Sequence, residues 1–467
     1  MTQFEYSSGF KHFFILILLS GCQVPELTQV TERPSAFLAK MTKSIEASGA
    51  SAELKVQDEA VSLGGVLDGS IADKNSGSDF VSVIRYALEN DPRIISKRRD
   101  LDSKIASIDY AEAQKDFQVS STIYGGIEDI TDSTSGIAVS LNASRLVYDG
   151  GLVDAQVDVA RFTAEAARLK LKASLNERAL RLGTLWIELE KYQTLQDQIK
   201  SRLRVLDPLI EQLEQVAKAG IGDVSKVTAA QRTVSTIRVA ETNVSEGLAQ
   251  AKIDFLNAFG ELQVDINYDP DFVADLLPAK ITNELAENSP LLLSLYSEYK
   301  ASLASVSSIK AKDGFNVGFE ARAMMPYAGS SEESDESIGL VARKTLFNDK
   351  TVESEIEQAV STAAAIAQEI RATYREGMRA IGTARQNIDS MDKAINLAGK
   401  NAQITADEII YLKQQLVIGG STLDSVLSAE ARLYDAESKE INFLAEKLKS
   451  QLRIASGLGL LSEALGL

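Results

Sequence analysis

Apolar residues recur every three or four positions in two very long stretches, 151–218 and 350–417. The same spacing continues in the shorter stretches 223–259 and 422–456. It is clearest in one run of the first long stretch: Leu195, Ile199, Leu203, Leu206, Ile210, Leu213 and Val216. This spacing is typical of a coiled-coil seam, and each long helix would extend for about 100 Å. The pattern predicts two long helical hairpins, the first kinked at Pro208 because proline removes a backbone hydrogen bond.

Strict alternation of apolar and polar residues marks four shorter segments in two pairs: 117–130 with 136–148, and 315–325 with 337–347. Within 136–148, for example, Val139 and Leu141 alternate with Ser140 and Asn142. A period of two predicts β-strands with one apolar and one polar face. Such strands fit a transmembrane barrel with a wet interior, and equally a half-buried soluble sheet.

The chain contains this order of elements twice. An offset of 199 residues aligns Gly220 with Gly419, and an offset of 198 aligns the Asn-x-Pro segments 90–92 and 288–290. A helix is predicted after each Asn-x-Pro segment, at 93–116 and 291–312. A duplicated module predicts two units. The first covers 80–275, with a β-hairpin at 117–148 and a helical hairpin at 151–259; the second covers 276–467, with hairpins at 315–347 and 350–456.

The first residues of the chain have the pattern of a secretion signal. Lys11 and His12 precede the apolar run 13–19, which is far shorter than the ~20 residues of a transmembrane helix. The segment Leu19–Cys22 resembles the bacterial lipobox, in which the cysteine is acylated. We therefore expect a lipoprotein signal at 1–21, lipidation at Cys22 and an acylated tether at 22–79. The alternative is an ordinary secretory signal with an incidental cysteine.

Composition removes several classes of function. The formal net charge of −17 argues against a nucleic-acid partner, because phosphate backbones would repel such a surface. Cys22 and His12 are the single cysteine and the single histidine. Removal of 1–21 would leave no Ser-His or Cys-His pair and no His/Cys zinc site. We expect neither an enzyme nor a cofactor; a carboxylate hydrolase would rest on nothing beyond abundant Asp and Glu.

Four strands per chain limit how the chain could span a membrane. They cannot close a barrel, and an open strand edge is not tolerated in lipid. A membrane-spanning form must therefore be an oligomer, and a homotrimer would supply twelve strands. The predicted fold is mainly α with a small β part. In its membrane-spanning form it is a long coiled-coil α-barrel plus four transmembrane β-strands per protomer.

The duplicated unit resembles the TolC family of outer-membrane exit ducts. The resemblance covers about 80–460 and rests on the segment 146–151, the helical turns 217–224 and 416–423, and the C-terminal segments 433–436 and 450–454. It implies a homotrimeric twelve-stranded barrel on a long periplasmic α-barrel in the bacterial outer membrane. It also implies two partners, a periplasmic adaptor (membrane fusion) protein and an inner-membrane transporter, either ABC or proton-driven.

The two helical turns are the candidate adaptor-docking tips. Gly220 and Gly419 suit left-handed positions after a helix, and Asp223, and Ser421 or Thr422, can cap the next helix. Small residues would leave the turn backbone open to a partner's helical hairpin. A plain coiled-coil turn needs the same glycines. The tip residues are Gly220, Ile221, Gly222, Val224, Ile418, Gly419, Gly420 and Leu423.

The periplasmic constriction departs from the family pattern. Where well-known members carry a gating pair of aspartates, this chain has Ser425 and Ser428, while Asp424 lies one residue early. We therefore expect the acidic ring at the aperture to be weakened or displaced. At the other end of the channel, Glu320 and Arg322 on the polar strand face are expected to line the barrel lumen.

These observations favour a passive, lipid-anchored exit duct of a tripartite export system. A periplasmic coiled-coil adaptor lipoprotein is the alternative, although adaptors usually have one helical hairpin rather than two equal copies. The Asn-x-Pro and Tyr-Asp-Gly-Gly segments resemble family members that serve type I secretion of polypeptides, whereas a lipobox is common in members that serve drug or metal efflux.

Overall fold

The computed structural model describes residues 80–126, 136–219, 224–260, 272, 275–278, 281–327, 334–345 and 349–467. All of them lie in the second of two compact units, Ala72–Leu467. The predicted signal at 1–21, the tether at 22–79 and Cys22 lie outside the described residues.

Two runs of elements follow one another in the same order. The first is α5 (Pro92–Glu112), β1 (Gln118–Gly126), β2 (Gly136–Tyr148), α6 (Leu152–Lys218) and α7 (Val224–Phe259). The second is α10 (Pro290–Lys312), β3 (Asn316–Tyr327), β4 (Asp335–Arg343), α11 (Asp349–Val417) and α12 (Leu423–Gly457). Four short helices add to these: α4 (Phe80–Glu89), η2 (Ala113–Lys115), α9 (Asn283–Glu287) and α13 (Leu460–Ala464).

The two Asn-x-Pro segments begin corresponding helices, as predicted. The Asp91 carboxylate accepts a hydrogen bond from the Arg93 amide (2.8 Å), and Pro92 occupies the first turn of α5. The Ser289 hydroxyl accepts one from the Leu292 amide (3.3 Å) at the start of α10. A side-chain cap followed by proline is a favourable helix start, because both satisfy or remove backbone donors that have no intrahelical partner.

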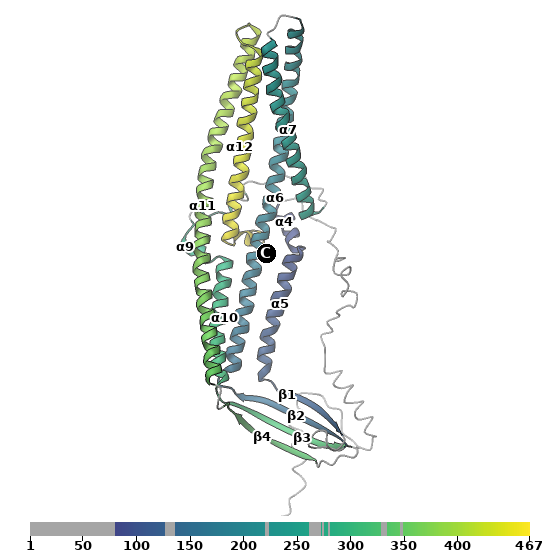
Figure 1. The fold of residues 1–467 in the computed structure, drawn as a ribbon, viewed down its shortest axis with the longest axis vertical. Helices are drawn as coiled ribbons and strands as arrows, with labels where there is room; N and C mark the ends of the chain where they lie inside the picture. The colour runs from purple at the N-terminus through teal and green to yellow at the C-terminus, as the bar shows by residue number, and fades with distance from the viewer. Residues whose placement is uncertain are drawn as a thin grey trace, which may run out of the picture. The chain divides into compact units, whose positions relative to one another are not determined.

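The helices form a layer in which α6 and α11 extend through both halves (Figure 1). In the half next to the sheet, α5 packs on α6, and α10 packs between α6 and α11. In the other half, α7 packs on α6, and α12 packs between α6 and α11. Helices α5 and α7 thus form one edge of the layer, and α11 forms the opposite edge.

The main hydrophobic core lies where these two halves meet. Trp186 of α6 is fully buried and makes edge-on contacts with Phe80 and Phe255, at ring-centre distances of 5.3 and 5.4 Å. Helix α13 is tied to this region by Asn176, whose side chain accepts from the Ser462 amide (3.0 Å) and donates to its hydroxyl (2.9 Å).

The coiled-coil seam is confirmed where side chains are described. Leu195, Ile199, Leu203 and Leu206 are buried, and Ile199 and Leu206 are fully so. Helix α6 continues through Pro208 as one element. The kink at that position stays a prediction.

The four strands form one antiparallel sheet in the order β1-β2-β3-β4, which leaves β1 and β4 as its edges. The predicted strand 337–347 was wrong at both ends, since β4 covers Asp335–Arg343. Arg343 pairs with Asn316, the first residue of β3. The ladder ends at that pair, because β3 begins at Asn316, shortly after the chain leaves α10.

Candidate functional site

The strand register gathers the alternating apolar residues of all four strands on one face of the sheet. Leu141 of β2 pairs with Ser121 and Ala323, and Phe319 of β3 pairs with Leu340. Large apolar side chains on this face are exposed: Val119, Ile123, Met325, Ile338 and Leu340. Soluble proteins rarely leave so contiguous an apolar patch uncovered. This face therefore needs a partner, either lipid or another chain.

The opposite face of the sheet carries the polar residues. Glu320 pairs with Ser144 and Gly339, and Arg322 pairs with Asn142 and Ser337. The two predicted lumen residues therefore share one face. The Glu320 carboxylate accepts two hydrogen bonds from the guanidinium of Arg343, one of them at 3.1 Å. The sequence analysis did not identify Arg343 as the partner of Glu320.

At the second helical turn, helix α11 ends in a C-terminal cap. Gly419 has a φ of +78°, which confirms its predicted left-handed conformation. Its amide donates to the Leu416 carbonyl (3.3 Å), and the Gly420 amide donates to the Gln415 carbonyl (2.9 Å). This pair of bonds is a Schellman motif, which satisfies carbonyls left open at a helix end. Ile418 is left strongly exposed, with 76% of its surface accessible.

Thr422 begins the return helix after this turn, as one of the two predicted caps. Its hydroxyl accepts from the Ser425 amide (3.3 Å) and lies 2.8 Å from the Ser425 hydroxyl. Ser425 therefore contributes to the cap, and with Asp424 and Ser428 it is half-buried. Leu423 is the first residue of α12.

The first helical turn is only partly described. Gly220, Ile221, Gly222 and the predicted cap Asp223 lie outside the described residues. Val224 is the first residue of α7.

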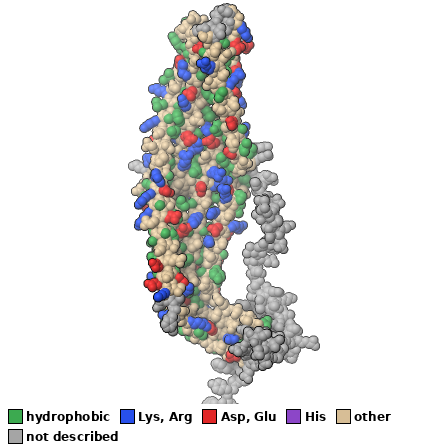
Figure 2. Space-filling view, in the orientation of Figure 1, with side chains coloured by type: hydrophobic (Ala, Val, Ile, Leu, Met, Phe, Trp, Pro, Cys, Tyr) green, Lys and Arg blue, Asp and Glu red, His purple; other side chains and the backbone are tan. Residues whose placement is uncertain are grey.

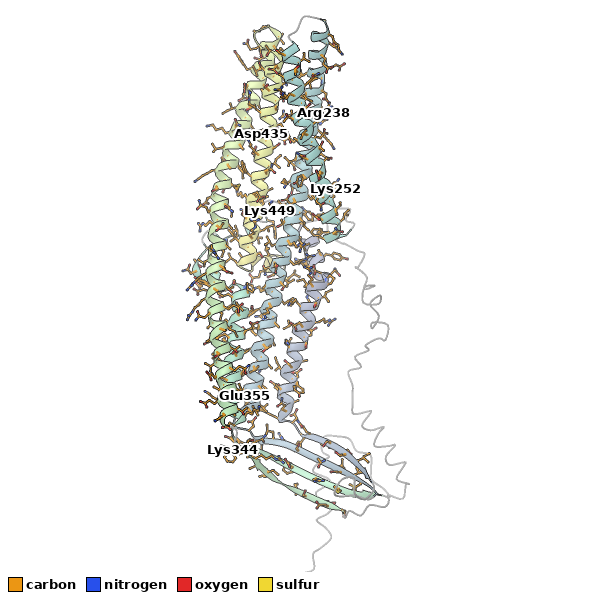
Figure 3. The ribbon with its side chains drawn as sticks, in the orientation of Figure 1. Arg238, Lys252, Lys344, Glu355, Asp435 and Lys449 are labelled. Carbon is orange, nitrogen blue, oxygen red and sulfur yellow. The ribbon has the colours of Figure 1, made fainter. Side chains whose placement is uncertain are left out.

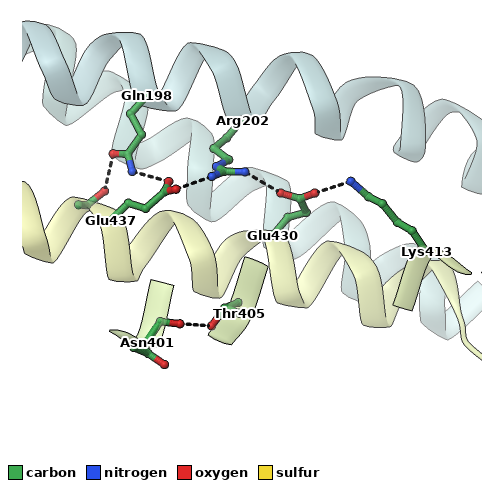
Figure 4. Close-up of polar contacts among 8 residues, drawn as sticks. Gln198, Arg202, Asn401, Thr405, Lys413, Glu430 and Glu437 are labelled. Carbon is green, nitrogen blue, oxygen red and sulfur yellow. Dashed lines mark hydrogen bonds and ion pairs between the residues drawn. The ribbon is translucent and has the colours of Figure 1, made fainter. Parts of the chain in front are cut away.

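A buried polar cluster that the sequence analysis missed lies close to the second turn and joins three helices (Figure 4). Glu430 of α12 is 2% exposed, and both of its carboxylate oxygens are bound. Arg202 of α6 donates to one at 3.2 Å, and Lys413 of α11 donates to the other at 2.8 Å. Arg202 also donates to Glu437 (2.6 Å), which accepts from Gln198 (2.7 Å). The cluster connects the first helical hairpin to both helices of the second.

The sequence does carry a signal for this cluster. Glu430 and Glu437 occur seven residues apart, among buried α12 positions such as Val426, Leu433 and Ala436. A charged residue repeated at a heptad position of an apolar seam often indicates a specific partner across the seam. Because a buried charge without partners is strongly unfavourable, this cluster constrains how α12 packs on α6.

A second group of charges lies beside the main core, around Lys449 (Figure 3). Its ammonium donates to the Glu188 carboxylate at 2.6 Å, and Lys191 binds the same carboxylate. Burial opposes ionisation of Glu188, but the two lysines outweigh it and lower the pKa of Glu188 below its usual value. The neighbouring Glu190 lacks such compensation, and burial raises its pKa to about 7.

Acidic and basic side chains are interspersed over the helical surface (Figure 2). In the described part of the chain, no group of His, Cys, Asp and Glu side chains could hold a metal ion. Among the same residues, no helix combines the length and the apolar character needed to cross a membrane.

Comparison with known proteins connects this architecture to outer-membrane proteins. No family model matches the chain. The chain is 21% identical over 413 residues to the outer membrane protein TolC of Vibrio cholerae serotype O1, which covers 85% of this chain and 94% of that protein.

Solved structures share the fold. The open state of the MtrE outer membrane channel of Neisseria gonorrhoeae matches with a TM-score of 0.69 at 14% identity, covering 81% of this chain and 88% of that chain. The outer membrane protein VceC of Vibrio cholerae matches with a TM-score of 0.67 at 17% identity, covering 81% and 95%. The predicted fold class and the resemblance to the TolC family are confirmed.

Proposed function

We propose that three copies of this chain, which resembles the TolC family in sequence and fold, form an outer-membrane channel. The channel serves as the passive exit duct of a tripartite export system. The observation that carries this proposal is the sheet: its apolar face exposes large side chains, and within the described residues each edge strand pairs on one side only. Lipid would cover the face, and further copies would pair the edges, so that no open edge meets lipid.

The internal repeat supports the assembly. Within one chain, α10 and α12 of the second run pack against α6 of the first run. Their counterparts α5 and α7 pack on α6 of their own run, and among the described elements neither packs against α11. Equivalent packing would bring α5 and α7 against α11 of another copy, since α11 is the counterpart of α6. Contacts of this head-to-tail kind close into a ring when the rotation between copies is a whole fraction of a turn, as it is in a trimer.

Exposed apolar residues lie on both of the edges that this packing would join. Helix α11 exposes Leu397, Ile404 and Tyr411 at intervals of one heptad, and α7 exposes Val239 and Ile253 at two heptads. Heptad spacing is what a coiled-coil contact between copies requires.

The helical tips are the proposed docking sites for a periplasmic adaptor, which would in turn connect an inner-membrane transporter. Ile418 and Val417 are exposed beside Gly419, which has open space around it. The Gln415 side chain lies against Gly420, and Leu423 begins the adjoining helix. By the internal repeat, Gly220, Ile221, Gly222 and Val224 would serve the first tip in the same way.

Opening is proposed to separate the second helical hairpin from α6 near these tips. The cluster around Glu430 would stabilise the closed packing, because parting α12 from α6 breaks its bond to Arg202. Asp424, Ser425 and Ser428 would then face the aperture, with fewer carboxylates than a paired aspartate ring. At the opposite end, Glu320 and Arg322 would line the barrel lumen.

Acylation of Cys22 is proposed to add a lipid anchor in the outer membrane. Cys22→Ala should abolish acyl labelling. If the variant trimers still insert normally, the anchor assists the barrel; if insertion fails, the lipid is essential.

The cargo is proposed to be polypeptide, as in type I secretion, on the basis of the Asn-x-Pro and Tyr-Asp-Gly-Gly segments. Efflux of drugs or metals is the alternative that the lipobox favours. Deletion of the gene distinguishes them: loss of a secreted protein supports the first, and greater sensitivity to toxic compounds supports the second.

Planar bilayers test the channel itself. Purified protein should run as a trimer in detergent and give defined conductance steps. A silent, monomeric protein would contradict the proposal. Protease treatment of intact cells separates a channel from an adaptor lipoprotein, since cleavage within 326–336 from outside requires that loop to reach the cell surface.

A further inference from the structure

Two basic residues lie on the apolar face of the sheet, where charge is least expected. Arg145 pairs with Phe319 across β2 and β3, and so shares the face of Leu141 and Ala143. Lys344 directly follows β4 and continues the alternation of Leu340 and Ala342. Both side chains are exposed. Charges on the lipid face of a barrel are unfavourable at mid-membrane and nearly neutral close to the interfaces.

Both cations lie at the end of the sheet that leads into the helices. Arg145 is near the end of β2 that continues into α6, and Lys344 lies at the junction of β4 with the helical layer (Figure 3). At the opposite end, β4 begins with Asp335 and Glu336, and the segments 127–135 and 328–334 contain acidic residues but no Lys or Arg. Among the described residues, the basic side chains of the apolar face are therefore confined to one end of the sheet.

Each cation lies over a phenylalanine ring. The Arg145 guanidinium is 5.1 Å from the centre of the Phe117 ring, and the Lys344 ammonium is 5.4 Å from that of Phe315. Phe117 also packs edge-on against Phe319, with 6.3 Å between ring centres. Aromatic rings prefer the membrane–water interface, and cation–π contact restrains the charged groups there.

Neither cation has an acidic partner in the described part of the chain. Other basic residues nearby have an acidic partner: Lys115 pairs with Asp154, and Lys312 pairs with Glu355. On the polar face of the same sheet, Arg343 pairs with Glu320. Arg145 and Lys344 are thus exposed, unpaired and held over aromatic rings beside an apolar surface. An amphiphilic anion would complement all of these features.

We propose that Arg145 and Lys344 bind the headgroup phosphates of phospholipids in the leaflet next to the helices. The acyl chains would lie along the apolar strand face, and the long basic side chains would extend to the phosphate level. Because the two cations lie on β2 and β4, a closed trimer would present one on every second strand. This ring would fix the height of the barrel in the membrane. The inference rests on the proposed channel, since it requires this face to contact lipid.

Native mass spectrometry of the full-length trimer tests the inference, with phosphatidylglycerol added in detergent as the probe. A cation near an anionic surface contributes about 1 kcal/mol, or roughly fivefold in affinity. Arg145→Gln and Lys344→Gln should each weaken lipid binding about fivefold, and the double variant about 25-fold. Arg145→Lys keeps the charge and should retain most of the binding. Arg322→Gln removes a charge from the opposite face and should leave lipid binding unchanged.

Two further probes identify the ligand. Diacylglycerol, which has acyl chains but no phosphate, should bind wild type and double variant alike. Inorganic phosphate at millimolar concentration should not displace phosphatidylglycerol; displacement would indicate a free-anion site and overturn the inference. Unchanged phosphatidylglycerol binding by a trimeric, conducting double variant would overturn it while leaving the channel intact. A wild type that neither trimerises nor conducts would overturn the channel proposal and this inference together.

Discussion

The helical layer and the sheet treat their large apolar side chains in opposite ways. Trp186 of the layer is fully buried within one chain, whereas Leu340 of the sheet is 68% exposed. The layer therefore has a core that one chain can complete, and the sheet does not. In the proposed channel, the two regions are therefore stabilised by different surroundings: the helices by burial from water, and the strands by lipid and by other copies of the chain.

Trp186→Ala should give the largest loss of stability, because it removes a large ring from a closed core. We expect a decrease of about 3–5 kcal/mol in the free energy of unfolding. Chemical denaturation followed by far-UV circular dichroism measures it. A loss below 1 kcal/mol would mean that the layer is not complete within one chain.

Glu430→Ala should cost about 3 kcal/mol, because it removes the two charge-assisted hydrogen bonds that the buried carboxylate accepts from Arg202 and Lys413. Channels carrying this variant should also open more readily in planar bilayers. Asp435→Ala is the matched control, since its pair with Lys439 is exposed and lies on one helix. Equal effects of the two variants would show that burial of the cluster is irrelevant.

Leu340→Arg should weaken membrane insertion of the sheet without changing the stability of the helices. A basic residue on the lipid face costs about 2–4 kcal/mol near mid-membrane, so insertion into lipid vesicles should fall while the helical unfolding midpoint stays unchanged. Val341→Arg alters the other face of the same strand and should insert normally. If both variants insert equally well, the two faces are not distinguished by the membrane.

Glu190→Gln should give the smallest effect, and one that depends on pH. Burial raises the pKa of Glu190 to about 7, so the folded layer is penalised once the carboxyl ionises. This loss of folding stability is absent below pH 4.5, grows between pH 4.5 and 7, and reaches its full size above pH 7. The variant should therefore exceed wild type in stability by about 1 kcal/mol at pH 8, after allowance for solvent screening, and equal it at pH 4.

The contribution of Glu188 to stability depends on pH in the opposite direction. Its pKa is lowered in the folded protein, so its contribution to stability is present above the ordinary value of 4.5 and is lost as the pH falls below it. Thermal unfolding of Glu188→Gln between pH 3 and 8 should show destabilisation only at the higher pH values. Parallel pH profiles for the two glutamate variants would contradict the assigned shifts.

Local pattern was sufficient for most of the fold. Alternation assigned the strand faces correctly, because a period of two fixes which side chains share a face regardless of partners. The Asn-x-Pro segments and Gly419 identified helix boundaries, since capping and left-handed conformation depend on neighbouring residues. The short helices α4, α9 and α13 were missed because tertiary packing, rather than periodicity, stabilises so few residues.

The candidate site was less predictable because its residues meet across elements. The bond between Glu430 and Arg202 spans 228 positions of sequence. The heptad spacing of Glu430 and Glu437 indicates a partner across the seam but does not say which residue it is. The partnership of Glu320 with Arg343 depended in the same way on the register between β3 and β4. The roles proposed for the helical tips and the aperture rest on the resemblance to the TolC family.

Cysteine labelling of adjacent strand positions tests the central claim most directly. In a Cys22→Ala background, Leu340→Cys and Val341→Cys would be assembled in lipid vesicles and exposed to a water-soluble maleimide. The account predicts that position 341 labels rapidly from a wet lumen, while position 340 is protected by lipid. Equal labelling of both positions, or protection of 341 rather than 340, would contradict it.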